Sequence, residues 1–139
     1  MKRALSAPLA IALLLVAGSA IAASPPSTRQ LLNSQWQVTR IDGKAPVSAR
    51  AQIRFDRTRN AATAGCNGIG GNWRVENGRL IGGPFVSTRM FCDGVMEQER
   101  AMADLLGSRP SVSIDRNVLR LNGGGHRLEA RRVPAPNPL

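Results

Sequence analysis

The sequence has few of the side chains on which most enzyme sites depend. It contains one histidine, two cysteines, no tyrosine, two tryptophans and three phenylalanines. His126 follows a run of glycines and no motif places a nucleophile beside it, so we interpret it as a solvated residue at a sheet edge. The few carboxylates form no recognisable acid–base pair. These shortages argue against an enzyme, a metal site and a bound cofactor.

Long apolar stretches are also scarce, and the main one stands at the start of the chain. There, Lys2 and Arg3 precede an apolar run, and Ala20 and Ala22 supply the small-x-small pair that signal peptidase recognises. These parts predict a secretory signal peptide over residues 1–23. The run is shorter than the roughly 20 residues that span a bilayer, so we do not expect an integral membrane protein. Because no cysteine lies near the cleavage point to accept a lipid, we expect a periplasmic or secreted protein.

Lysine is almost missing from the part that remains after cleavage, where Lys44 is the only one. The whole chain carries a net charge of +10, and removal of Lys2 and Arg3 leaves +10 − 2 = +8. Such a charge favours an anionic partner, such as an acidic component of the bacterial envelope. Nucleic acid fits poorly, since the arginines are scattered, stacking aromatics are few and export is expected. A GC-rich genome would explain the preference for arginine without any partner, and we favour this explanation over an anionic partner.

Cys66 and Cys92 both lie in the exported part. In an oxidising compartment such a pair indicates a structural disulfide, with two buried free thiols as the alternative. A zinc site normally needs four ligands, and two cysteines with one histidine do not supply them. The C-x-x-C spacing of thiol oxidoreductases is missing as well.

The residues after the signal peptide suffice for one compact domain. We expect a mobile lead over residues 24–29, a domain over 30–132 and a disordered, proline-rich tail over 133–139. Short runs of alternating apolar and polar residues predict strands, and the turn signals Asp42-Gly43 and Asn77-Gly78 separate some of them. The runs centre on Trp36–Val38, Ile53–Phe55, Trp73–Val75, Arg79–Ile81, Val112–Ile114, Leu119–Leu121 and Leu128.

One internal segment has the periodicity of a helix. Its apolar face consists of Val95, Met102, Leu105 and Leu106. We expect Asp93 as the N-cap and Gly107 near the end, with Glu97 and Glu99 favoured by the positive end of the helix dipole. Many short strands and one helix predict an α+β, mostly β fold. We expect a small antiparallel curved sheet or a partly closed barrel, covered by the helix.

The glycine-rich stretch Gly65–Gly71 lacks the Lys-Ser/Thr pair of a phosphate-binding loop, and its glycines favour bends within a sheet. Together with Thr88–Cys92 and the following helix, this stretch resembles the META domain of HslJ-like proteins. That family shows a G-C-N-x-[FI]-x-G core, a hairpin, a T-x-M-x-C motif and a helix with an early Glu. The motif residues are Gly65, Cys66, Asn67, Gly71, Thr88, Arg89, Met90 and Cys92.

The resemblance covers nearly the whole mature chain. It implies a compact β-rich fold with one helix, related in shape to secretion pilot proteins. It also implies a place in the bacterial envelope and an association with heat shock and antibiotic tolerance. It implies no reaction, because no catalytic residues are established for the family. Many relatives are lipoproteins, whereas this chain has no lipid-accepting cysteine.

Most of the motif residues have a plain structural interpretation. The two cysteines would join the glycine-rich stretch to the segment that enters the helix. Asn67 and Thr88 would satisfy backbone groups at bends. Met90 would fill the core, whereas Arg89 is the candidate for an exposed recognition residue.

Three functions compete on these grounds. The leading hypothesis is a non-catalytic, monomeric binding module of the envelope that contributes to stress tolerance. Its partner would be an anionic envelope component, a small apolar ligand or an envelope protein. The second is a proteinaceous inhibitor of an envelope or host hydrolase. The third is a hydrolase with an unfamiliar site that uses His126.

Overall fold

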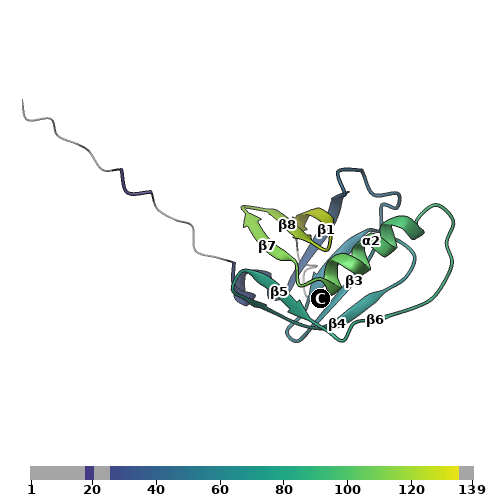
Figure 1. Ribbon diagram of the computed structural model, residues 1–139, viewed down its shortest axis with the longest axis horizontal. Coiled ribbons are helices and arrows are strands. Elements are labelled where there is room, and N and C mark those ends of the chain that lie inside the picture. The colour runs from purple at the N-terminus through teal and green to yellow at the C-terminus, as the bar shows by residue number, and fades with distance from the viewer. Residues whose placement is uncertain (1–17, 21–25, 135–139) are drawn as a thin grey trace, which may run out of the picture.

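The computed structural model describes residues 18–20 and 26–134. The predicted signal peptide, apart from residues 18–20, and the end of the predicted tail lie outside the described residues. Figure 1 shows the elements of the described part. They are α1 (Thr28–Leu31), β1 (Ser34–Ile41), β2 (Gln52–Phe55), β3 (Arg59–Thr63), β4 (Ile69–Glu76), β5 (Arg79–Gly82), β6 (Val86–Ser87), α2 (Met96–Gly107), β7 (Ser111–Asp115), β8 (Val118–Gly123) and β9 (His126–Val133).

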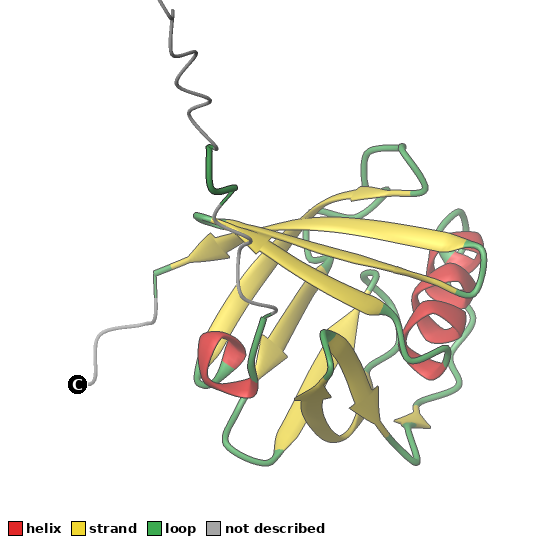
Figure 2. Ribbon diagram, turned by 60° about the vertical axis from the view of Figure 1, so that its left-hand side comes forward, coloured by secondary structure: helices red, strands yellow, loops and turns green. Residues whose placement is uncertain are grey.

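The strands form one antiparallel sheet in the order β3-β2-β1-β9-β8-β7-β5-β4. β3 also pairs with β4, from Arg59 opposite Asn72 to Ala62 opposite Ile69, and this pairing closes the sheet into a barrel of eight strands (Figure 2). The short strand β6 is added on the other edge of β4. The predicted mostly β fold with one covering helix is confirmed, and the barrel is closed.

The strands form where the predicted alternation places apolar side chains inward. In β1, Trp36 and Val38 are buried in the barrel and their neighbours Gln35 and Gln37 are half-buried on the outer face. The turn residues have the positive φ that two-residue hairpins require: 50° and 79° for Asp42-Gly43, and 50° and 71° for Asn77-Gly78. Both predicted turns are confirmed.

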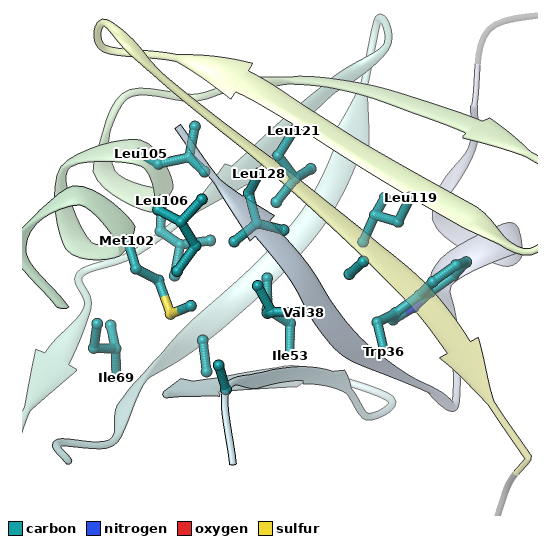
Figure 3. Packing of buried hydrophobic residues seen from close by; sticks show 14 of the residues in the cluster. Trp36, Val38, Ile53, Ile69, Met102, Leu105, Leu106, Leu119, Leu121 and Leu128 are labelled. Carbon is teal, nitrogen blue, oxygen red and sulfur yellow. The ribbon is translucent and has the colours of Figure 1, made fainter. Parts of the chain in front are cut away.

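Helix α2 covers one end of the barrel, where the longer helix appears in Figure 2. Its residues Met102, Leu105 and Leu106 are almost completely buried. Leu105 and Leu106 face Leu121 of β8 and Leu128 of β9 in Figure 3, and all four belong to one buried cluster with Met102. The apolar face predicted from the sequence is therefore the face that completes the core. No helix among the described residues is long and apolar enough to cross a bilayer.

Some local details of the fold were not predicted from the sequence. The N-cap of α2 is Val95, not Asp93, because Gly94 turns the chain with a φ of 77° before the helix begins. β3 was not expected, since its inward residues Asn60 and Ala62 give no strong apolar alternation, and neither was the two-residue strand β6. Helix α1 spans Thr28–Leu31, just before β1. β9 extends to Val133, which pairs with Gln35, because Pro134 is the first residue without an N–H donor.

Candidate functional site

The two cysteine motifs meet at one place on the barrel. Cys66, in the bend before β4, and Cys92, on the way into α2, form a disulfide with a Cα–Cα distance of 6.0 Å. The predicted disulfide is confirmed, and the alternative of two free thiols is wrong. The bond ties the glycine-rich bend to the segment that precedes the helix.

Asn67 is the buried centre of this junction, with only 4 % of its surface exposed. Its Nδ2 donates to the carbonyl oxygen of Met90 (2.9 Å) and to Glu99 Oε2 (2.7 Å). Its Oδ1 accepts from the Met90 N–H (2.7 Å) and from Thr88 Oγ1 (2.9 Å). Two amide hydrogens and two lone pairs are thus all used. The side chain holds the segment before Cys92 by both main-chain groups of Met90.

Glu99, in the first turn of α2, supports Asn67 from the other side and is 6 % exposed. Its Oε1 accepts from the main-chain N–H of Cys66 (3.0 Å) and of Asn67, and its Oε2 accepts from the Asn67 amide. The sequence suggested only that this carboxylate suits a helix N-terminus. The family resemblance implies a helix with an early Glu, but it does not single out Glu99 over Glu97 for this buried role. These hydrogen bonds join α2, the disulfide and the bend into one unit. The Glu99 carboxylate is charged, and a charged acceptor makes stronger hydrogen bonds than a neutral one.

The anchored chain presents six consecutive exposed residues, Val86 to Phe91, which we call the exposed segment. It consists of β6 and the first residues of the connection from β6 to α2, and this connection swings away from the barrel in Figure 1. Met90 is 57 % exposed and Phe91 is 81 % exposed, so Met90 does not fill the core as expected. Arg89, which lies between Thr88 and Met90, is exposed as well. The network therefore fixes the backbone of this segment while its side chains face solvent.

The backbone of the exposed segment also has an open edge. Ser87 lies opposite Ile69, and the Thr88 N–H donates to the Gly68 carbonyl oxygen (3.1 Å). Hydrogen-bonded and non-hydrogen-bonded pairs alternate along an antiparallel pair, so the main-chain groups of Ser87 face away from β4. The Met90 N–H and carbonyl again point inward, to Asn67. In an extended chain the main-chain groups of Arg89 then point outward, like those of Ser87.

A groove of about 340 Å³ separates the exposed segment from α2. It is lined by Asn67, Ile69, Ser87, Thr88, Arg89, Met90, Phe91, Met96, Glu99, Arg100 and Ala103. The exposed surface of the groove is mostly apolar, although polar and charged residues contribute to the lining, and Arg89 and Arg100 add positive charge. A partner could therefore reach the exposed segment from two sides. One is the groove, and the other is the outer edge.

His126 lies elsewhere, at the start of β9. Its Nδ1 is 2.7 Å from Asp42 Oδ2, and its Nε2 is 3.8 Å from Asp104 Oδ2, so carboxylates face both ring nitrogens in place of the expected solvent. Partial burial raises the pKa of Asp42, but hydrogen bonds from the Arg127 N–H and from His126 outweigh it and hold the pKa below its usual value. Among the residues described, no three His, Cys, Asp or Glu side chains are grouped to hold a metal ion.

A closed antiparallel barrel with a helix over one end and a disulfide beside that helix defines a small, disulfide-linked β-barrel domain. The family model of the META domain matches residues 29–134, and the chain belongs to that family. The disulfide and the family are both consistent with an oxidising envelope compartment.

Two solved structures share the fold. One protein solved by NMR has a TM-score of 0.68 at 22 % identity, with 75 % of this chain and 92 % of that chain covered. An NMR structure of a protein from Burkholderia xenovorans has a TM-score of 0.62 at 24 % identity, with 82 % and 93 % covered. Comparison with curated proteins gives no match. At these identities the likeness concerns the fold alone.

Proposed function

We propose that this META domain is a non-catalytic binding module of the bacterial envelope whose exposed segment docks a protein partner. The observation that carries the proposal is the construction of that segment. Its backbone is fixed by Asn67, Glu99 and the disulfide, while Met90 and Phe91 project into solvent. A fixed loop loses little conformational entropy on binding, so its apolar contacts convert efficiently into affinity.

A protein partner fits this surface better than a lipid or a polysaccharide. The main-chain groups of Ser87 face away from β4, and those of Arg89 would do so in a continued extended chain, so an extended polypeptide would offer the complementary row of donors and acceptors. Met90 and Phe91 would serve as the apolar anchors that dominate such interfaces. The net charge of +8 expected after signal-peptide removal (+10 − 2) favours a partner with an acidic surface and would speed association. The role in stress tolerance that the family resemblance implies would follow from this contact.

The test uses immobilised protein and an envelope extract. The double variant Met90→Ser/Phe91→Ser removes the apolar anchors, and Val47→Ser, at another exposed apolar residue, is the matched control. Both changes are on the surface and should leave the free energy of unfolding within about 0.5 kcal/mol. We expect at least one protein that the wild type and the control retain and the double variant loses. That protein, once purified, should bind with the same dependence on the two residues.

Two results would contradict the proposal. One is an identical set of retained proteins for all three baits. The other is a rise in melting temperature with lipopolysaccharide, peptidoglycan fragments or fatty acids that the double variant abolishes, since that would assign the segment to a different class of ligand.

A further inference from the structure

The outward main-chain groups expected around Arg89 resemble those that a serine protease binds in its substrate. Such an enzyme pairs with an extended chain as an added strand and takes one side chain into its primary pocket. In the exposed segment, the main-chain groups of Ser87 face away from β4, and the Met90 N–H and carbonyl oxygen are bonded inward to Asn67. An extended chain between them turns the main-chain groups of Arg89 outward, and the Arg89 side chain is exposed. A pocket with an aspartate at its base, as in trypsin, is complementary to an arginine side chain.

The residue after Arg89 is held in a way that favours inhibition over digestion. Met90 is bound by its N–H and its carbonyl oxygen to the buried Asn67 amide, at 2.7 and 2.9 Å. A loop that is already in its bound conformation avoids the ordering cost of a flexible substrate. The same anchoring restrains the atoms that must separate when the bond between Arg89 and Met90 is cut.

The disulfide links the two parts of the chain on either side of the Arg89–Met90 peptide bond. Hydrolysis would add the hydroxyl of a water to the Arg89 carbonyl carbon and a hydrogen to the Met90 nitrogen. Cys66 lies before the cut and Cys92 after it, so the two pieces would stay joined. The new amine of Met90 would also stay beside Asn67 Oδ1, which holds that nitrogen in the intact chain. Product release would be slow, and the reverse reaction could reform the bond.

We infer that the exposed segment is a substrate-like loop for a trypsin-like serine protease, with Arg89 in the primary pocket, and that the domain inhibits the enzyme. This inference rests on the proposed function and names the class of the protein partner. The exposed Met90 and Phe91 would contact the enzyme on the leaving-group side of the bond.

The experiment measures the inhibition constant against trypsin and chymotrypsin with small chromogenic substrates. The wild-type protein should inhibit trypsin at micromolar concentration and chymotrypsin much more weakly. Arg89→Ala should weaken trypsin inhibition about 100-fold or more, as expected for a central anchor. Arg89→Lys should retain it, and Arg89→Phe should shift inhibition towards chymotrypsin. Arg74→Ala, at an exposed arginine of β4, is the control and should have no effect.

Gel electrophoresis of the mixture gives a second readout. We expect slow cleavage after Arg89, with two pieces that separate only after reduction of the disulfide. No inhibition of trypsin by the wild type, equal inhibition by Arg89→Ala, or rapid digestion without inhibition would each overturn the inference. If the envelope extract still yields a partner that depends on Met90 and Phe91, the proposed function stands and only the protease is wrong. If both experiments fail, both proposals are wrong.

Discussion

Replacing Asn67 by aspartate tests the buried junction with almost no change in side-chain size. The change converts the Nδ2 donor into a carboxylate oxygen. It removes the hydrogen bonds from Nδ2 to the Met90 carbonyl and to Glu99 Oε2, and it sets two carboxylates against each other at a site that is 4 % exposed. A bond to a charged group contributes about 1.5–3 kcal/mol and a neutral one about 1 kcal/mol. The free energy of unfolding should therefore fall by about 2.5–4 kcal/mol, before any repulsion is added.

Urea unfolding at pH 7 under oxidising conditions measures this loss. Asn72→Asp, the same chemical change at an exposed residue of β4, is the matched control and should stay within about 0.5 kcal/mol of the wild type. The neighbouring carboxylate of Glu99 should raise the pKa of the introduced carboxyl. A raised folded-state pKa means that the penalty is full at neutral pH and shrinks as the pH falls and the group becomes protonated. The cost of Asn67→Asp should thus be smaller at pH 4 than at pH 7.

The reasoning would be refuted if Asn67→Asp costs no more than Asn72→Asp. It would also be refuted if the cost of Asn67→Asp grew on acidification. Either result would mean that the Asn67 amide does not hold the exposed segment to the barrel.

Three further predictions concern other parts of the fold. Cys66→Ser/Cys92→Ser should lower the free energy of unfolding by about 3–4 kcal/mol; a reducing agent should do the same to the wild type and nothing to the variant. Leu106→Ala should cost about 2–5 kcal/mol in urea unfolding, since the side chain is 1 % exposed. Because the pKa of Asp42 is lowered, its carboxylate stabilises the fold above about pH 4. Asp42→Asn should therefore be less stable than the wild type at pH 7. The difference should shrink as the pH falls below about 4 and the Asp42 carboxylate becomes protonated. Urea unfolding from pH 2 to 7 measures this difference.

Features with local causes could be predicted from the sequence. The alternation around Trp36 reflects one buried face of a strand, and the Asn77-Gly78 turn reflects two residues that tolerate positive φ. The disulfide followed from two cysteines in a chain expected to be exported. Each of these signals lies within a few residues of the feature or in the composition of the whole chain.

The remaining features depend on contacts between distant parts of the chain. Glu99 is buried because α2 brings it against the N–H of Asn67, 32 residues earlier. A pattern of neighbouring residues does not reveal a contact between residues so far apart in the sequence. Met90 looked like a core residue because it is apolar. Its main-chain groups are both bound by Asn67, which leaves its side chain on the surface. Strand β3 is not predicted because its inward residues, Asn60 and Ala62, are polar and small and do not give the apolar alternation of a strand. Its pairing with β4 nevertheless closes the barrel.

Site-specific photo-crosslinking tests the central claim, that the exposed segment is the binding surface, most directly. A photoreactive phenylalanine analogue replaces Phe91 in one sample and Val47 in another, and both are irradiated with the envelope extract. The account predicts a discrete protein adduct at position 91 and none at position 47. Excess wild-type protein should compete the adduct away, and excess Met90→Ser/Phe91→Ser should not. Equal crosslinking at both positions, or competition by the double variant as strong as by the wild type, would contradict the account.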